Sequence, residues 1–407
     1  MHAQSARQYS FFAAVLYALL IIYGSLFPLS GWQTPEASPF SFMHQEFPKR
    51  FSRSDIILNI MVYMPLGLFL SMHLFKKRGV LVAVLCALCA GIALSFSMET
   101  AQAWLPHRTS SVVDLLTNSV GTAIGAVLIV FWDKSGFVGV HAYRFRDAFF
   151  LQGNASHLTM TVCILWALSQ LSPFVPSLGR SNLIFGLKPL WFAILDPQSI
   201  SGTKVLVYTS YLSGLGLLIL AVSRDTWRGV LVFLAFIFCV FALKIPVVSR
   251  QVSMESVAGF IAAVVILTLL HKARPRLRSV IGIVLLVVGF YWAQVDASGS
   301  IGQYMPMQFN WIPFKGHLVN IVGLANILGS LWLFMALAVF TMHTLPKHAH
   351  GPAWFAGGIV VGIYVFWLEW LQRTIPGRVA DITDVLLALA GWCIAWFILR
   401  SEDSLSS

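Results

Sequence analysis

The chain has 407 residues, of which 58% are hydrophobic and only 11% are charged. About a quarter of the residues in soluble globular domains are charged, so this composition excludes a soluble protein and is typical of one that crosses a membrane many times. The net charge of +11 comes from 27 basic and 16 acidic residues. The basic residues are scattered over short loops, which argues against nucleic-acid binding and is better explained by attraction to anionic lipid headgroups.

Apolar runs of about 17–25 residues predict membrane-spanning helices. The sequence contains about twelve of them, and we predict an all-α polytopic integral membrane protein. The first run is not followed by a small-x-small cleavage site, so we expect it to be a retained span rather than a signal peptide. The predicted spans are 11–29, 56–74, 80–104, 111–131, 157–176, 205–222, 229–247, 254–271, 279–295, 318–342, 353–374 and 383–399.

The same polar pattern occurs twice, 270 residues apart, and each copy lies between two predicted spans. The first copy reads Glu99-x2-Gln102-x3-Pro106-x-Arg108-x5-Asp114. The second copy has identical spacing and reads Glu369-x2-Gln372-x3-Pro376-x-Arg378-x5-Asp384. Ionisable residues at membrane depth are costly and therefore rare. Their matched spacing indicates an internal repeat.

The predicted spans divide into three units of four helices, 1–150, 151–275 and 276–407. The first and third units carry the complete pattern after their third span. The middle unit has an echo there, which reads Pro246-x3-Arg250-x4-Glu255. Each unit also has a similar segment after its first span. These segments are Ser38-Pro39-Phe40, Asn182-Leu183-Ile184-Phe185 and Asn310-Trp311-Ile312-Pro313-Phe314.

The two densest basic clusters, Lys76–Arg78 and Lys272–Arg278, fall on the same side of a twelve-span topology. The positive-inside rule makes that side cytoplasmic. Both termini are then expected in the cytoplasm, and both polar patterns are expected to face outward. We expect the segment Gly186–Lys204, which contains Trp191, to lie along the outer membrane interface.

The order of residue types in the pattern predicts a polar cluster at the outer end of a helical hairpin. Glu99 and Gln102 share a helix face because they are three residues apart. The prolines end that helix. Asp114 then begins the next helix, where the helix dipole favours a negative charge, and Ser110 or Ser111 can cap it. We expect the glutamate, the arginine and the aspartate to converge in both copies.

Two interpretations of this cluster remain open. In the first, each arginine pins its hairpin through charge-assisted hydrogen bonds to the carboxylates. In the second, the cluster binds an anionic or polyol headgroup, with the arginine on a phosphate or carboxylate. The candidate residues for either role are Glu99, Gln102, Arg108, Asp114, Asn118, Glu369, Gln372, Arg378 and Asp384.

Small residues follow the first copy at a spacing that lets another helix approach closely. Gly121 and Gly125 have this small-x3-small spacing, and Gly391 keeps the first of the two positions in the second copy. Ala388 replaces Asn118 there. We expect Asn59 and Asn326 to bond neighbouring helices, with lining of the site as the alternative.

The remaining polar residues do not predict a metal site or a cofactor site. Cys86 and Cys89 form a C-x2-C in an apolar run without partner ligands, so packed thiols are expected. His348 and His350 could bind a metal, but no acid or cysteine accompanies them in their loop. We therefore expect no metal and no cofactor.

The outer segment followed by E-x2-Q-x3-P-x-R-x5-D resembles the VanZ-like membrane family, which is named after a protein associated with resistance to teicoplanin. The resemblance covers residues 31–130 and 305–399 well and the middle weakly. The first copy departs from the pattern by lacking an asparagine before Pro39, and the third unit lacks the Pro65-Leu66-Gly67 of the first. The resemblance implies four-helix units in the inner membrane of a bacterial envelope.

We expect a non-catalytic protein that binds a membrane lipid, an amphiphile or a lipid-linked envelope component at its outer face. One alternative is a membrane-embedded enzyme on a lipid-linked substrate, with Glu99 or Glu369 as general base. Another is a transporter, which internal repeats and intramembrane carboxylates suggest. Against transport, the repeats run parallel and the charges gather at one surface. The sequence leaves the ligand, the pathway and the oligomeric state open.

Overall fold

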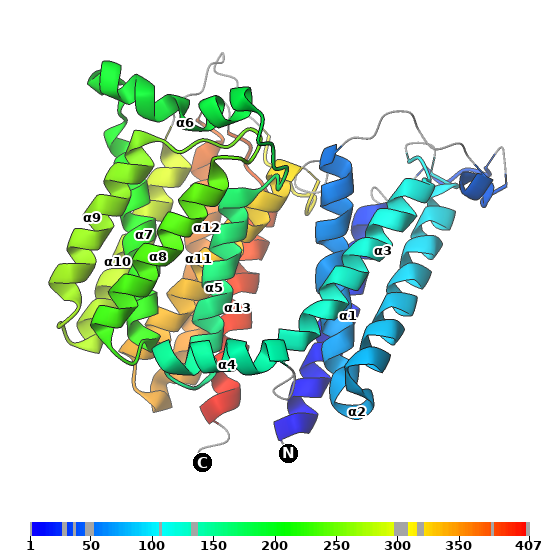
Figure 1. The fold of residues 1–407 in the computed structure, drawn as a ribbon, viewed down its shortest axis with the longest axis horizontal. Coiled ribbons are helices and arrows are strands. Elements are labelled where there is room, and N and C mark those ends of the chain that lie inside the picture. Colours follow the sequence, from blue (N-terminus) through cyan, green and yellow to red (C-terminus); the bar gives the residue numbers. More distant parts are fainter. Residues whose placement is uncertain are drawn as a thin grey trace. The chain divides into compact units, whose positions relative to one another are not determined.

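A computed structural model gives the fold (Figure 1). It describes residues 2–26, 31–35, 38–44, 53–105, 108–131, 137–296, 308–315, 321–375 and 378–403. Apart from short 3-10 turns and three isolated bridges, the secondary structure of these residues is α-helical, as the composition predicts. Pro106 and Pro376, which we expected to end helices, lie outside the described residues.

The chain divides into two compact units, Met1–Arg146 and Asp147–Ser407. The first ends near residue 150, where the first predicted unit ends. The second and third predicted units share one compact unit, because helices of the one pack against helices of the other. The division into three units of four helices therefore stays a prediction.

The first compact unit is built on one long hairpin. Its helix α2 consists of two arms that meet at Gly79, whose φ of 75° reverses the chain between two spans. Helix α3 packs closely on the first arm: a Cβ at Gly121 would lie 2.3 Å from the Ile60 carbonyl oxygen, and one at Gly125 would lie 1.9 Å from that of Met64. The expected close approach is confirmed. The elements are α1 (His2–Leu26), η1 (Ser41–His44), α2 (Arg53–Gln102), α3 (Val112–Val127) and η2 (Leu128–Phe131), followed by α4 (Phe137–Phe149) across the boundary.

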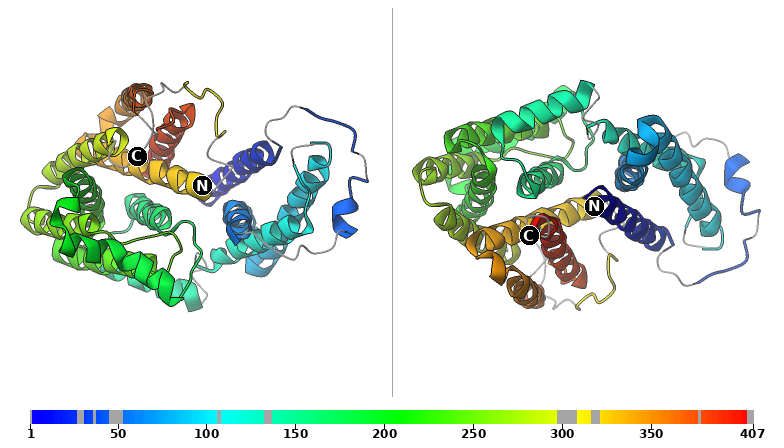
Figure 2. Two further views of the ribbon diagram at one scale, coloured as in Figure 1. Left: turned by 90° about the horizontal axis from the view of Figure 1, so that it is seen from above. Right: turned by 90° about the horizontal axis from the view of Figure 1, so that it is seen from below.

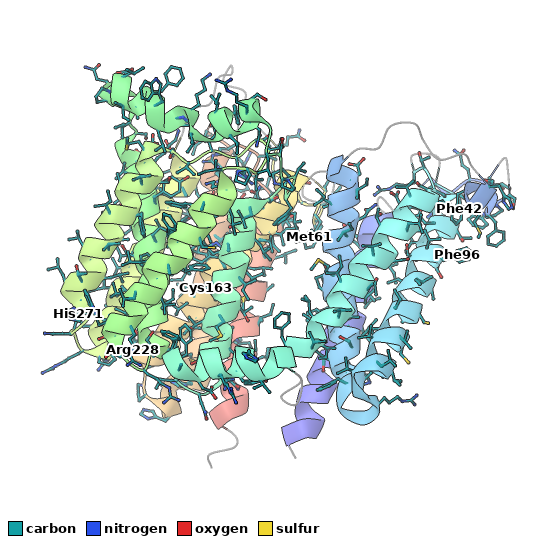
Figure 3. All side chains as sticks on the ribbon, viewed as in Figure 1. Phe42, Met61, Phe96, Cys163, Arg228 and His271 are labelled. Carbon is teal, nitrogen blue, oxygen red and sulfur yellow. The ribbon has the colours of Figure 1, made fainter. Side chains whose placement is uncertain are left out.

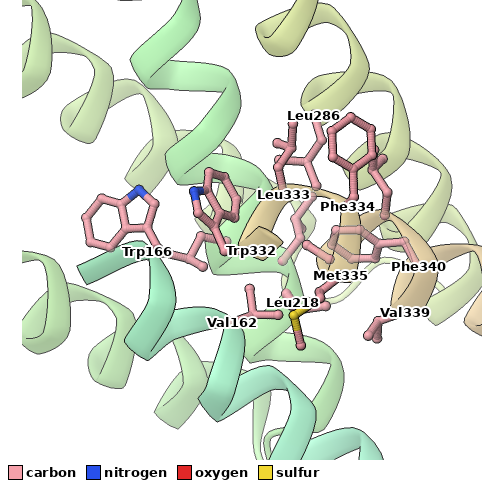
Figure 4. Packing of buried hydrophobic residues seen from close by; sticks show 14 of the residues in the cluster. Val162, Trp166, Leu218, Leu286, Trp332, Leu333, Phe334, Met335, Val339 and Phe340 are labelled. Atoms are coloured by element: carbon pink, nitrogen blue, oxygen red, sulfur yellow. The ribbon is translucent and has the colours of Figure 1, made fainter. Parts of the chain in front are cut away.

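The second compact unit surrounds two central helices, α7 and α11. About 61% of the apolar window of each is buried, more than in any other candidate span among the described residues. Trp332, Phe334 and Phe340 of α11 pack with Leu218 and Leu286 in one apolar core (Figure 4). The elements are α5 (Asn154–Leu171), α6 (Arg180–Leu195), η3 (Pro197–Ser199), α7 (Gly202–Val222), α8 (Thr226–Lys244), α9 (Met254–Leu270), α10 (Pro275–Val295), α11 (Ile321–Thr344), η4 (Lys347–Ala349), α12 (His350–Gln372) and α13 (Ile382–Asp403).

Nine helices in the described part of the chain are long and apolar enough to cross a membrane. Every predicted span overlaps a helix, but α1, α5 and α9 do not meet those limits of length and hydropathy, so the count of twelve is not confirmed. The chain is nevertheless a multi-pass membrane protein. Many apolar side chains on the outside of its helices are exposed, which lipid explains and water does not.

Helix α6 differs in direction from the long helices of its unit. It lies across their ends, as the side and end views show (Figures 1 and 2). Trp191 is 64% exposed and Phe192 51% exposed on this helix. The orientation fits the expected interfacial segment, although the helix begins and ends earlier than that prediction.

Candidate functional site

Glu99 and Glu369 each connect the end of one helix to the start of the next. Glu99 lies in the last turn of α2 and is 3% exposed, and Glu369 lies in the last turn of α12 and is fully buried. The Oε2 of Glu99 accepts the N–H of Ser111 at 2.8 Å, and that of Glu369 accepts the N–H of Asp381 at 2.9 Å. The first N–H groups of a helix lack partners within it and carry positive dipole charge. This contact explains why an acid is placed at a helix C-terminus.

The residue that donates to the glutamate also caps the following helix. Ser111 is the N-cap of α3, and its Oγ accepts the N–H of Val113 at 3.1 Å, so one of the two predicted caps is confirmed. In the second copy Asp381 accepts the N–H of Thr383 at 2.8 Å. Sequence reasoning missed Asp381, although the 270-residue offset from Ser111 and its short polar side chain before a helix are the signals that identify it.

Asp114 and Asp384 lie in the first turn of the next helix and face the glutamates. Asp114 interacts electrostatically with Glu99, and Asp384 with Glu369. Asn59 donates to the Oδ1 of Asp114 at 2.9 Å, which places this asparagine in the first cluster and not only at a helix contact. Each copy therefore brings two carboxyl groups together, as the spacing predicts.

The arginines differ from their expected role. The guanidinium of Arg378 donates to the carbonyl oxygens of Ala293 at 2.7 Å and Asp296 at 3.2 Å, at the C-terminal end of α10. Arg108 donates to the carbonyl oxygen of Gly24 at 2.9 Å, near the end of α1. The last carbonyls of a helix have no partner within it and carry negative dipole charge, so they attract a cation. Arg378 thus caps the end of α10, and these contacts do not support the first of the two interpretations, in which it pairs with the carboxylates.

The glutamines contact the same helix ends as the arginines. The Nε2 of Gln102 donates to the carbonyl oxygen of Ser25 at 3.1 Å. The Nε2 of Gln372 donates to the side chain of Gln294 at 2.9 Å and to its carbonyl oxygen at 3.3 Å. The pattern thus separates into two pairs. Glutamine and arginine contact the ends of α1 and α10, while glutamate and aspartate lie at the junctions of α2 with α3 and of α12 with α13.

Each copy leaves one buried oxygen acceptor without a hydrogen-bond donor among the described residues. In the second copy it is the Oε1 of Glu369. In the first it is the Oδ1 of Asn118, whose Nδ2 donates to Ser95 at 2.9 Å. Buried acceptors are normally paired, so an unpaired one requires an explanation. For Glu369, a proton shared with the carboxyl group of Asp384 is one explanation, and a donor group from outside the chain is another.

The outer segments pack on an aromatic residue one turn before each glutamate. Phe42 of the first segment lies 6.0 Å from Phe96, measured between ring centroids (Figure 3). Phe309 lies 5.6 Å from Phe366 in the second copy. Asn310 also pairs with Asp381, to whose Oδ2 it donates at 2.8 Å. Sequence reasoning missed the repeated phenylalanines, because aromatic residues are common throughout this chain.

The histidine candidate has an ordinary hydrogen-bonding role. The Nε2 of His350 lies 3.1 Å from the carbonyl oxygens of Met342 and Leu345. The described residues contain no group of three or more metal-ligating side chains.

The family profile of VanZ/LLP1 matches residues 11–133 and 260–402, which together make up more than half of the chain. The chain belongs to the VanZ/LLP1 family. The two matched regions confirm the internal repeat, and each contains one complete polar pattern. No curated protein and no solved structure matches the chain. Membership of this family links the protein to the cell envelope or to antibiotic resistance.

The stretch between the two VanZ/LLP1 matches keeps one contact of the pattern. Arg250 donates through Nε to the carbonyl oxygen of Ser172, the residue that follows α5. This is the helix-end contact that Arg378 makes with α10. The predicted echo at Arg250 thus makes the same kind of contact outside the matched regions, which supports the prediction of a middle unit.

Proposed function

We propose that this VanZ/LLP1 protein binds the headgroup of an amphiphile or lipid-linked envelope component at the outer face of the bacterial inner membrane, without catalysing a reaction. The observation that carries the proposal is the Oε1 of Glu369, a fully buried acceptor at the end of a membrane helix, for which the described residues offer no donor other than a proton shared with Asp384. A buried acceptor of this kind binds a ligand that brings its own donor.

The hydrogen bonds around the cluster narrow the chemistry of the ligand. One terminal nitrogen of Arg378 donates to two helix-end carbonyls, so part of its donor capacity is used within the protein. The acceptors that remain, on Glu369 and Asn118, favour hydroxyl or amine groups. We therefore favour a polyol or amine headgroup over an anionic one at these two clusters.

The basic residues support the outward orientation. Arg228 and His271 lie at the end of the second compact unit opposite α6 (Figure 3), beside the cluster Lys272–Arg278. Basic residues favour the cytoplasmic side. The ends of α10 and α12, where the second cluster lies, are then at the outer face, and both termini are cytoplasmic.

An acid–base enzyme is the second candidate, and the facing carboxyl groups of Glu369 and Asp384 favour it. Such a pair can hold and transfer a proton. In this case Glu369→Gln would abolish turnover of a lipid-linked substrate by the purified protein. If the protein only binds its ligand, neither the wild type nor Glu369→Gln should turn over the substrate.

The test is lipidomic identification of what co-purifies with the protein. We expect a hydroxyl- or amine-rich amphiphile to be enriched with the wild type and lost from Glu369→Gln at unchanged thermal stability. Glu255→Gln is the matched control, because Glu255 is an acid in the first turn of α9 that bonds the N–H of Ser201. The same lipid profile for all three proteins would exclude the proposed site.

A further inference from the structure

The middle of the chain carries a buried lysine where the flanking patterns carry glutamine. Counting from the arginine of each pattern, Lys244 corresponds to Gln372, and Phe241 stands where Glu369 would be. Lys244 is the last residue of α8 and only 5% exposed. This cluster therefore has a phenylalanine in place of the acid of the flanking patterns and a cation in place of their glutamine.

The ammonium group of Lys244 is under-used as a donor. It has three N–H groups, and the hydrogen bond recorded for it goes to the Oε1 of Gln170 at 3.3 Å. Gln170 is near the end of α5, as Gln294 is near the end of α10. Lys244 thus makes the contact that Gln372 makes with Gln294, but with an extra charge and further donors.

A second cation lies beside Lys244. Arg250 is half-buried and electrostatically opposes the charge of Lys244. Burial lowers the pKa of the Arg250 guanidinium from its ordinary value. Its Nε is bonded to Ser172, so the two terminal nitrogens of its planar group remain to bind a further acceptor.

Neither of these two charges has a carboxylate partner among the described residues. Tyr208 of α7 is the neighbour that acts on Arg250, and it is a neutral phenol. Glu255 of α9 is the nearby acid, but it accepts the N–H of Ser201 and interacts with Lys204. Helix-end carbonyls supply about half a negative charge per helix. That is less than one buried and one half-buried cation require.

The cluster also lies at the helix ends that α6 crosses. Arg228 begins α8 at the end away from α6 (Figure 3), so Lys244 lies at the end where α6 crosses the long helices. Chain segments cover this end: the N–H of Val248 donates to Val175 at 2.9 Å, and Asn182 donates to the carbonyl oxygen of Pro246 at 3.0 Å.

We propose that Lys244 and Arg250 bind a phosphate group at this end of the second compact unit. A phosphate offers the several oxygen acceptors that the ammonium and the guanidinium lack, and it offsets both charges. The site is separate from the carboxyl clusters, so it does not depend on the function proposed for them. A lipid phosphodiester and free inorganic phosphate share this chemistry.

The experiment measures thermal stability of delipidated full-length protein in a neutral detergent, with added inorganic phosphate or short-chain phosphatidylglycerol. At least one probe should raise the melting temperature of the wild type in a saturable way. A response to the lipid alone identifies a headgroup site, and a response to phosphate at equal strength identifies a free-anion site. If neither probe raises the melting temperature, the proposal is overturned.

Lys244→Gln tests the residue with little risk to folding, because it installs the residue of the flanking patterns. We expect it to weaken probe binding by roughly ten-fold or more, since a charge-assisted hydrogen bond is lost. Without a probe it should melt above the wild type, because an unneutralised cation is removed. Lys204→Gln, at an exposed lysine near the same end, should bind like the wild type. Unchanged binding by Lys244→Gln, or a lower melting temperature without probe, would overturn the site.

Discussion

Glu99 and Glu369 use one carboxylate oxygen to hold the start of the following helix. The second oxygen of Glu369 has no donor among the described residues and lies near the carboxyl group of Asp384. The negative charge of Glu369 is therefore less important for folding than its acceptor oxygen. The Oε2 of Glu369 therefore has the structural role, and its Oε1 is the atom available to a ligand.

Glu369→Gln should keep the free energy of unfolding within about 1 kcal/mol of the wild type, because the amide oxygen can still accept the Asp381 N–H. Glu369→Leu should lower it by about 1–3 kcal/mol, because that buried N–H loses its acceptor. Unfolding in a denaturing detergent series measures both. Glu99→Gln and Glu99→Leu should follow the same order, and equal stability of the Gln and Leu variants would contradict the assigned contact.

Arg378→Ala should destabilise the protein by about 2 kcal/mol, because two carbonyls at the end of α10 lose a charged donor. Adding Glu369→Gln and Asp384→Asn should not restore the loss, since the guanidinium does not pair with those carboxylates. An ion-pair staple predicts the reverse, a partial rescue. The melting temperatures of the single and triple variants decide between the two.

The sequence predicts the acid pair but not the partner of the arginine, for a physical reason. Glu369 and Asp384 lie on adjoining helix ends, so a local hairpin brings them together. Arg378 finds its partner on α10, which precedes it by more than eighty residues, and only tertiary packing selects that helix. Ser111 was predictable as a cap because capping depends on the neighbouring residues alone.

At the scale of helices, apolar run length predicts where the spans lie, because the bilayer sets that length. Helix α6 is apolar over much of its length but carries Arg180 and Lys188, and it lies across the helix ends. Its exposed Trp191 and internal Pro189 are the signals that distinguish it. Helices α1, α5 and α9 show the opposite limit, because the repeat predicts them as spans although they do not meet the limits of length and hydropathy.

Gly125→Ala should destabilise the first compact unit by about 1–3 kcal/mol or more, because the new Cβ would meet the Met64 carbonyl oxygen at 1.9 Å. The matched control is Gly329→Ala in α11, where a Cβ would meet nothing within 4 Å. That change should be neutral or stabilise by up to about 1 kcal/mol through helix propensity. Melting temperatures that move in the same direction for both variants would contradict the close packing of α2 and α3.

At the scale of the whole molecule, the topology makes a prediction that reporter fusions can check. Fusions after residues 78, 145, 275 and 349 should report a cytoplasmic location, because the basic clusters lie at that level. Fusions near 110 and 380 should report an external location. The reversed pattern would place the carboxyl clusters at the inner face and exclude an outer-leaflet ligand.

The contact between Arg378 and the end of α10 can form only after both have been synthesised. The carbonyl oxygen of Ala293 accepts a hydrogen bond from Arg378, and the ribosome adds Arg378 85 residues after Ala293. At about 5–20 residues per second, that delay is roughly 4–17 s. Until Arg378 is added, the terminal carbonyls of α10 lack the guanidinium that caps them in the folded protein. A chain that stops before residue 378 lacks the arginine cap at the end of α10. This uncapped helix end distinguishes a truncated protein from a complete one, and membrane quality control could recognise it.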